Sequence, residues 1–294
     1  MDDKIIGAVI AGRLRSVGTS QVLRVLPVHD RRHLGPFVFL DHMGPVALAP
    51  GAGFDVRPHP HIGLSTLTYL FEGDGLHRDS LGTVQVIASG DVNLMTAGRG
   101  VVHSERSTDR SRASGGPHHG LQLWIALPEA DEVGPPSFSH LSRADVPRLE
   151  REGVTASVIL GEAWGIAARL RHPSAPLFVE ARLAAGARLE LPAAPELGIY
   201  VVAGCVRVGA NDVVANTLAV VLPGATATME ALEESRVVLL GGPPLGERFI
   251  DWNFVSSSKE RIDQAKADWR ERRFPAIPGD DVEYESLPEA RRAP

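Results

Sequence analysis

The chain of 294 residues contains a single cysteine, Cys205. One thiol cannot build an intrachain disulfide framework, and it cannot supply the set of sulfur ligands that a cysteine-based zinc or iron–sulfur site needs within one chain. This composition is typical of a reducing compartment, so we expect a cytoplasmic protein. Because Cys205 lies in an apolar run in the part of the chain without histidine, we expect a buried structural thiol and not a catalytic one.

Positive charge is also in short supply. Thirty lysine and arginine residues stand against 36 acidic residues, for a formal charge of −6, so the average surface repels a phosphate backbone. No stretch of about 18 apolar residues runs without charge or proline, and the start, MDDKII, is acidic where a signal peptide is basic. We therefore expect no direct binding to nucleic acid, no membrane-spanning helix and no export signal.

Several common catalytic motifs are missing as well. The sequence contains no phosphate-binding P-loop and no GxGxxG dinucleotide fingerprint. It also has no GxSxG turn, which carries the nucleophile of many serine hydrolases. These absences leave a nucleotide-dependent enzyme and a serine hydrolase without support from the sequence.

Turn-forming residues, in contrast, are abundant, with 30 glycines and 22 prolines. Short β-branched runs closed by these residues recur from 22–27 through 237–240. The spacing predicts an all-β fold of the antiparallel barrel or sandwich type. The polar stretch 138–152 lacks strand alternation, so we place a domain boundary near residue 141, between domains at 1–140 and 141–294.

A weak internal repeat favours two similar barrels in tandem. The segment YLFEG at 69–73 resembles YVVAG at 200–204, and each is followed by an apolar strand that closes in Gly98 or Gly224. Aligning these two pairs of segments shows which residues of the second half correspond to a site in the first half.

One segment near the C-terminus, 257–272, predicts an α-helix. Ser257 and Glu260 stand three residues apart in the pattern of a capping box. Ile262, Ala265 and Trp269 fall on one face. We expect this face to dock the helix on a barrel.

The histidines point to a metal site. All 11 lie in the first 172 residues, and His59 and His61 stand two apart, as do His103 and Glu105. Residues two apart in a strand project from the same face, so two facing strands can present three imidazoles and one carboxylate to one point. Such a ligand set suits a divalent first-row metal. Iron(II) is our first choice, and nickel, manganese, copper and zinc remain open.

Other polar residues nearby are candidates for supporting roles. His77 and Asp79 have the same two-residue spacing, and they either orient a metal ligand or form a solvated turn. His118 and His119 are adjacent, so at most one of them faces the pocket; His119 is our candidate. For His42 we favour packing in a loop over a place in the pocket.

The segments that hold these residues resemble the pirin family, a branch of the cupin superfamily. The similarity runs from RPHPHIGLSTLTYLFEGDGLHRDSLG through GDVNLMTAGRGVVHSE to HHGLQLWIAL, and extends to FIDWNFVSSSKERIDQAKADW. The resemblance implies a bicupin fold of two jelly-roll-type barrels, with one mononuclear iron in the first barrel held by His59, His61, His103 and Glu105. General cupins often take a glutamate ligand four residues after the HxH motif. That place is Ser65 here, so Glu105 supplies the carboxylate, as the pirin pattern implies.

The repeat predicts a different second barrel. Each candidate ligand in the first barrel lies at a fixed distance along the sequence from Tyr69 or Gly98. The same distances from Tyr200 and Gly224 lead to Glu190, Pro192, Met229 and Ala231, of which only Glu190 can bind a metal. No histidine is available at any nearby register. We expect the second barrel to be metal-free and structural.

The resemblance implies an oxidoreductase, a metal-dependent dioxygenase of the quercetinase type. Its substrates would be dioxygen and a flavonol or another enolisable hydroxy-ketone, and Glu105 is the natural base for the substrate proton. The alternative is a regulatory iron protein, whose oxidation state modulates a protein partner such as a transcription factor or a metabolic enzyme. Both functions need the same four ligands, so the sequence does not separate them. We expect a monomer.

Overall fold

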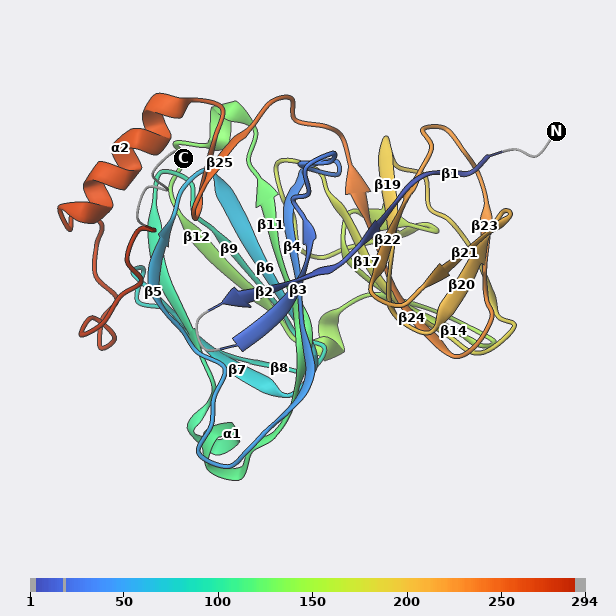
Figure 1. Ribbon diagram of the computed structural model, residues 1–294, viewed down its shortest axis with the longest axis horizontal. Helices are drawn as coiled ribbons and strands as arrows, with labels where there is room; N and C mark the ends of the chain where they lie inside the picture. Colours follow the sequence, from blue (N-terminus) through green and yellow to red (C-terminus); the bar gives the residue numbers. More distant parts are fainter. Residues whose placement is uncertain (1–3, 18–19, 289–294) are drawn as a thin grey trace.

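The computed structural model describes residues 4–17 and 20–288. It consists of two β-barrels side by side, with the first barrel at the left of Figure 1 and the second at the right. Each barrel combines a seven-stranded sheet with a four-stranded sheet. The prediction of two tandem all-β domains with a helix near the C-terminus is confirmed.

The first barrel contains most of the first half of the chain. Its seven-stranded sheet has the order β12-β9-β6-β11-β4-β3-β2, and its strands are β2 (Arg13–Val17), β3 (Ser20–Leu26), β4 (Phe37–Leu48), β6 (Leu64–Glu72), β9 (Val92–Thr96), β11 (Gly116–Ala126) and β12 (Ser137–Leu141). Its four-stranded sheet has the order β5-β10-β7-β8, and its strands are β5 (Val56–His61), β7 (Asp74–Asp79), β8 (Val84–Ala88) and β10 (Val101–Arg106). A short helix that the sequence analysis missed, α1 (Asp109–Ser114), precedes β11.

The second barrel repeats this plan. Its seven-stranded sheet has the order β1-β22-β19-β24-β17-β14-β13, and its strands are β1 (Ile6–Ala11), β13 (Arg148–Arg151), β14 (Val154–Leu160), β17 (Leu177–Leu183), β19 (Glu196–Ala203), β22 (Thr217–Val221) and β24 (Ser235–Gly242). Its four-stranded sheet has the order β18-β23-β20-β21, and its strands are β18 (Arg188–Glu190), β20 (Cys205–Val208), β21 (Asn211–Val214) and β23 (Thr228–Ala231). A two-stranded ribbon, β15 (Glu162–Ala163) and β16 (Ile166–Ala167), follows β14. The 3-10 turn Glu129–Asp131 lies between β11 and β12 of the first barrel, and the 3-10 turn Arg143–Asp145 connects β12 to β13.

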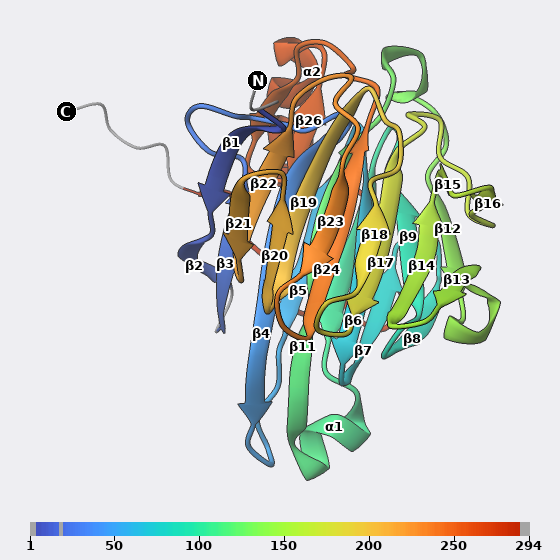
Figure 2. The same cartoon turned by 90° about the vertical axis from the view of Figure 1, so that its right-hand side faces the viewer.

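The two seven-stranded sheets pack against each other through a shared apolar cluster. In the view of Figure 2 the strands of the second barrel lie in front of those of the first. Alternate residues of β11, such as Leu121 and Leu123, share one apolar cluster with Tyr200 of the second barrel. The residues between them, such as Gln122 and Trp124, line a pocket inside the first barrel. These strands are therefore covered on both faces, which explains why they are apolar runs with little alternation.

Both ends of the chain cross between the barrels, so the structure divides the chain differently from the predicted 1–140 and 141–294. At the N-terminus, β1 pairs with β22 and completes an edge of the second barrel's sheet. After β24 the chain returns to the first barrel, where β25 (Phe249–Asp251), β26 (Phe254–Ser256) and α2 (Lys259–Arg270) pack. Burial of apolar side chains against Ile62 drives this return.

The helix α2 confirms the predicted segment but begins from a different serine. Ser258 is the N-cap and accepts a hydrogen bond from the backbone of Arg261. Ser257 is not free to cap, because its backbone N–H and hydroxyl both donate to Glu132. Ile262 and Ala265 are buried against the first barrel. None of the helices in residues 4–17 and 20–288 combines the length and apolar character needed to cross a membrane.

Cys205 is a second correction. It is only half-buried, because it is the first residue of β20 and directly follows the turn that ends β19. The expectation of a fully buried thiol was wrong.

Candidate metal centre

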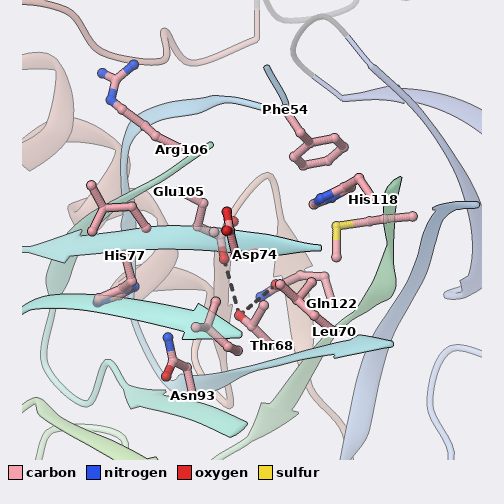
Figure 3. A pocket seen from close by; sticks show the side chains of 14 residues that line it. Phe54, Thr68, Leu70, Asp74, His77, Asn93, Glu105, Arg106, His118 and Gln122 are labelled. Atoms are coloured by element: carbon pink, nitrogen blue, oxygen red, sulfur yellow. Dashed lines mark hydrogen bonds between the residues drawn. The ribbon is translucent and has the colours of Figure 1, made fainter. Parts of the chain in front are cut away.

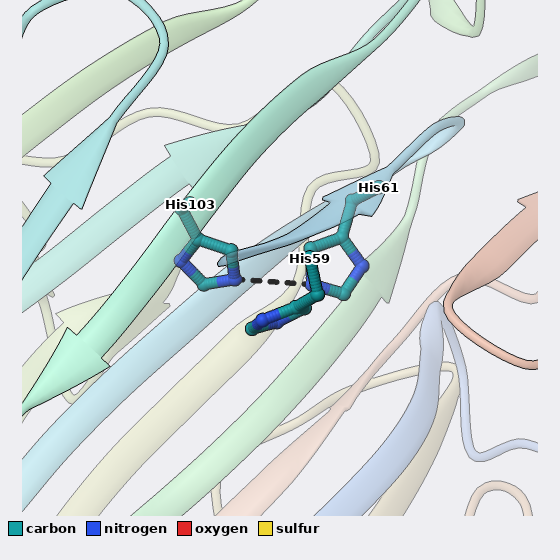
Figure 4. Close-up of side chains that lie close together, drawn as sticks. All are labelled: His59, His61 and His103. Atoms are coloured by element: carbon teal, nitrogen blue, oxygen red, sulfur yellow. Dashed lines mark hydrogen bonds between the residues drawn. The ribbon is translucent and has the colours of Figure 1, made fainter. Parts of the chain in front are cut away.

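Three buried imidazoles converge inside the first barrel, as Figure 4 shows. His59 and His61 project from β5, and His103 projects from the adjacent β10, directly opposite His59. One ring nitrogen from each histidine lies within 4.8 Å of the others. The structure thus brings together the three histidines that the two-residue spacing placed on common strand faces.

Hydrogen bonds assign the protons of two of these rings. The Nδ1 atom of His59 lies 2.7 Å from the carbonyl oxygen of Arg57. The Nδ1 atom of His61 lies 2.8 Å from the carbonyl oxygen of Asn253. A carbonyl oxygen can only accept, so each Nδ1 carries the proton and donates it. The Nε2 atoms of both rings are therefore left with free lone pairs.

A chain of contacts through His77 assigns the third ring. Asp79 accepts a 3.0 Å hydrogen bond from Nε2 of His77, which leaves Nδ1 of His77 as an acceptor. That atom lies 3.5 Å from Nδ1 of His103, so His103 donates from Nδ1 and its Nε2 is also free. Asp79, His77 and His103 therefore form a row that orients a candidate ligand in the way that outer carboxylates orient metal-bound histidines.

The environment of His77 and Asp79 excludes the solvated turn that the sequence left open. Both side chains are buried. Asp79 also accepts hydrogen bonds from the backbone N–H groups of Leu81 and Thr83. Burial alone would raise the pKa of Asp79, but the hydrogen bonds outweigh it and hold the pKa below its ordinary value. Asp79 is therefore a charged acceptor next to the centre.

The donor set fits a divalent first-row metal. The free Nε2 atoms of His61 and His103 lie only 3.1 Å apart, and two lone pairs at that distance repel unless a cation lies between them. Nitrogen ligands at about 2.1 Å from an ion and at right angles to each other lie about 3 Å apart. Burial lowers the pKa of His59 to about 4 and the pKa values of His61 and His103 well below the usual range. All three rings are therefore neutral, as ligands must be.

Glu105 lies beside this cluster and not within it. The pairing of β10 with β5 shifts register between His103 and Glu105, and the close group of potential ligands contains the three histidines alone among the described residues. Oε1 of Glu105 lies 3.3 Å from the hydroxyl of Thr68, which also contacts Gln122 (Figure 3). Burial raises the pKa of Glu105. The carboxylate thus faces the same pocket as the histidines, and its role as a fourth ligand remains a proposal.

A pocket of about 1230 Å³ opens onto the three histidines and Glu105. Its wall contains Phe39 and Trp124, whose rings stack with centroids 4.0 Å apart and 12° between their planes. The ring of Trp124 stands 5.2 Å from that of His61. The site is therefore a metal centre beside an aromatic wall built of rings that stack on each other.

A smaller pocket of about 430 Å³ is also lined by Glu105. Figure 3 shows His77, Asn93 and His118 around it. His118 stacks on Phe54, with ring centroids 4.6 Å apart. Glu105 lines both spaces, as do Met43, Phe54 and Gln122.

His119, the predicted pocket residue, faces the interface between the barrels instead. Its Nε2 atom lies 2.7 Å from Nε2 of His42, and Nδ1 of His42 lies 2.8 Å from the hydroxyl of Tyr200. Adjacent residues of a strand face opposite ways, and His118 occupies the inner side. His42 is fully buried in β4, so the expectation that it packs in a loop was wrong.

The C-terminal hairpin of β25 and β26 is a part of the centre that the sequence analysis missed. Its turn supplies the Asn253 carbonyl that binds His61, and Trp252 lines the metal pocket. The hairpin packs so closely that a Cβ atom on Gly63 would lie 2.0 Å from the carbonyl oxygen of Val255. A backbone carbonyl has no signature in the sequence. For Gln122 and Trp124, however, the two-residue spacing within LQLWIAL was a usable signal.

Two barrels of this topology, one with a cluster of three histidines on neighbouring strands, define a bicupin. The profile of the pirin family matches residues 19–125. The profile of the pirin C-terminal cupin domain matches residues 178–275. The chain belongs to the pirin family.

Individual relatives agree with this assignment. A pirin-like protein from Caulobacter vibrioides is 48% identical over 97% of this chain and 100% of the relative. The crystal structure of a quercetin 2,3-dioxygenase from Acinetobacter baumannii matches 99% of this chain and 98% of its own, with a TM-score of 0.88 and 32% identity. The bacterial pirin YhhW from Escherichia coli, solved in complex with nickel(II), matches 81% of this chain and 99% of its own, with a TM-score of 0.63 and 20% identity. The last match shows a shared fold.

Proposed function

We propose that this protein is a metal-dependent dioxygenase of the quercetinase type, acting on a flavonol or a similar enolisable hydroxy-ketone. One observation carries the proposal: three neutral imidazoles with free Nε2 atoms lie beside a pocket walled by stacked aromatic rings. The similarity to a structure described as a quercetin 2,3-dioxygenase supports the same reaction.

In this proposal His59, His61 and His103 hold one divalent metal ion, with Glu105 as the fourth ligand. Iron(II) is the first choice, and nickel, manganese, copper and zinc remain alternatives. When bound, the metal supplies Lewis-acid chemistry, because it polarises the oxygen of a ligand and orients it.

The protein's own groups account for the remaining steps. Phe39 and Trp124 line the pocket with apolar ring atoms, which contact an aromatic ligand and exclude water. Glu105 accepts the proton of the substrate hydroxyl. Its carboxylate lines the same pocket as the three histidines, which is the position that a general base for a metal-bound ligand requires. Thr68 holds this carboxylate in place through its hydroxyl.

Oxygen uptake tests the proposal. The full chain is loaded separately with iron(II), nickel(II), manganese(II), copper(II) and zinc(II), and oxygen consumption is recorded with a panel of flavonols. We expect turnover with at least one metal and its loss in His103→Ala. The control is His172→Ala, a histidine that contacts Ser65 outside the pocket.

Glu105→Gln separates the base from the metal ligands. General-base catalysis is worth about 10²- to 10⁴-fold, so turnover is expected to fall by that factor while metal remains bound. Undiminished turnover in the metal-loaded variant would eliminate Glu105 as the base. Absence of oxygen uptake with every metal and flavonol would contradict the dioxygenase proposal.

A further inference from the structure

A charged pair lies in the wall of the metal pocket. Arg24 of β3 stands directly across the sheet from Asp41 of β4, and both side chains line the pocket. Nε and Nη2 of Arg24 donate to Oδ1 and Oδ2 of Asp41, each over 2.7 Å. This two-fold contact fixes the plane of the guanidinium group.

The guanidinium group continues the aromatic wall. Its Cζ atom lies 4.3 Å from the ring centroid of Phe39. Phe39 stacks on Trp124, and Trp124 contacts the ring of His61. We call these four groups, Arg24, Phe39, Trp124 and His61, the planar row. Trp124 and Arg24 cover opposite faces of Phe39, so a flat ligand that reaches the metal centre through this pocket contacts the edges of the planar row, with its far end at Arg24.

Arg24 keeps donors available for such a ligand. A guanidinium group has five N–H donors, and Nη1 makes no hydrogen bond with residues 4–17 or 20–288. The Arg24 side chain is 28% exposed, whereas that of Asp41 is 4% exposed. The cation is therefore the more accessible member of the pair.

No other lysine or arginine among the described residues lines this pocket, whose acidic lining residues are Asp41, Glu105 and Glu285. An anionic group on a ligand therefore has one cationic partner there, and elsewhere it meets like charge. The position of this partner, at the end of the planar row away from His61, determines where on the ligand the anion must lie.

We propose that Arg24 is a specificity-determining residue that selects aromatic ligands with an anionic oxygen, such as a carboxylate, at the end opposite the metal-chelating group. The proposal rests on the proposed function for the chelating end and adds the chemistry of the far end. Asp41 holds the guanidinium group in plane and weakens its attraction for the ligand by competing for it.

Ligand binding tests this without turnover. The full chain is loaded with nickel(II) under nitrogen, and the dissociation constants of 3-hydroxyflavone and its 4′-carboxy and 7-carboxy derivatives are measured by titration. Two derivatives are used because either ring of the flavonol can point toward Arg24. We expect one of them to bind about tenfold more tightly than the parent compound, in line with a hydrogen bond to a charged group.

Variants of the pair should shift this preference in opposite directions. Arg24→Gln is expected to abolish it, and Asp41→Asn is expected to increase it because the guanidinium group then has no competing charge. Arg24→Gln leaves the buried Asp41 carboxylate without its partner. The double variant Arg24→Gln/Asp41→Asn, a neutral hydrogen-bonded pair, is therefore measured alongside it and should also show no preference.

The outcomes distinguish this proposal from the function on which it rests. Tight binding of 3-hydroxyflavone with no preference for either carboxylate, or a preference that survives both Arg24 variants, would overturn the role of Arg24 and leave the dioxygenase proposal intact. Failure of all three ligands to bind the nickel-loaded protein would overturn both.

Discussion

The two barrels carry different chemistry on one strand arrangement. In the first barrel His103 of β10 pairs with His59 of β5. In the second, Met229 of β23 pairs with Leu189 of β18, the corresponding strands. An apolar pair therefore occupies the position at which the first barrel places two candidate ligands.

The correspondence continues along both strands. Glu105 lies opposite His77 in the first barrel, and Ala231 lies opposite Val206 in the second. Leu191 lies two residues beyond Leu189, as His61 lies two residues beyond His59. Its backbone N–H donates to the carbonyl oxygen of Ala227, so the pairing with the β23 segment continues to this position and Leu191 corresponds to His61. The sequence repeat had led to Glu190 and Pro192 for the two β18 positions. The observed pairing moves both positions by one residue.

The positions of the candidate ligands in the first barrel are core positions in the second. Leu189, Met229, Ala231 and Val206 all belong to the packed core of the second barrel. The first barrel replaces that core with polar groups and a pocket, and buried polar groups lower stability unless they are paired. We therefore expect apolar packing at these positions to make the second barrel more stable than the metal-free first barrel.

The largest expected effect comes from giving the first barrel the residues of the second. In His59→Leu/His103→Met, two of three imidazoles are absent, so we expect bound metal to fall from one ion per chain to none by elemental analysis. Without metal, this variant should unfold at the same temperature as the wild type or a higher one, because apolar side chains replace imidazoles with free lone pairs. Full metal content in the variant would refute the three-histidine centre.

A second prediction compares one buried carboxylate in each barrel. Glu132 receives hydrogen bonds from Ser256 and Ser257 next to the hairpin, and it pairs with Arg248. Glu180 pairs with arginines in the second barrel and is as deeply buried. Removing Glu132 leaves the buried Arg248 without its partner, which costs about 3–5 kcal/mol. Removing Glu180 should cost less, because its partners Arg182 and Arg236 keep contact with water.

Only the Glu132 variant should also weaken metal binding. Its loss releases the hairpin whose Asn253 carbonyl orients His61, and loss of such an outer contact costs about 10- to 100-fold in metal affinity. Glu132→Ala and Glu180→Ala are compared by denaturant unfolding and by competitive titration with a chelator. Equal metal affinity in the two variants would mean that the hairpin plays no part in the centre.

These contacts explain which parts of the site the sequence could predict. His59, His61 and His103 were found because each pair lies in a regular strand, where a spacing of two means a shared face. The displacement of Glu105 follows from a register shift, which depends on the partner strand. The Asn253 carbonyl reaches His61 across 192 residues without any side-chain signature.

The domain boundary illustrates the same limit. Alternation and turn residues identified many of the strands, because these signals are local. The expectation that the polar stretch 138–152 lacks strands was wrong, because it contains most of β12 and all of β13. The pairing of β1 with β22 and the return of α2 to the first barrel are long-range choices. The first depends on an unpaired edge at β22 of the second barrel, and the second depends on an apolar face around Ile62 of the first barrel.

A third prediction concerns acid and the interface between the barrels. Burial, reinforced by the nearby His119, lowers the pKa of His42 to about 4, whereas an unfolded histidine titrates near 6.5. Between these values the unfolded chain binds more protons, so stability falls as pH drops. Linkage gives a loss of about 2 kcal/mol between pH 7 and pH 5 from this one residue.

The His42→Gln variant should lose that much less stability over the same range. Denaturant unfolding of the metal-free wild type and variant is measured at pH 7 and at pH 5. The change in unfolding free energy of the variant is subtracted from that of the wild type, so that the contributions of the other histidines cancel. An identical acid sensitivity in the two proteins would show that His42 does not stay neutral at the interface.

The smallest expected effect is the loss of the N-cap of α2, which should lower stability without changing metal affinity. Ser258 caps α2 within the helix itself, so Ser258→Ala should cost about 1 kcal/mol, as loss of an N-cap does. Its bond does not reach the hairpin turn, so metal affinity should stay at the wild-type value, unlike that of Glu132→Ala. Ser257→Ala is the matched variant: it removes a hydroxyl that contacts Glu132 over 3.2 Å and caps nothing. If Ser258→Ala lowered metal affinity as much as Glu132→Ala, any loosening of the C-terminal segment would suffice, and the specific path from Glu132 through the hairpin to His61 would be wrong.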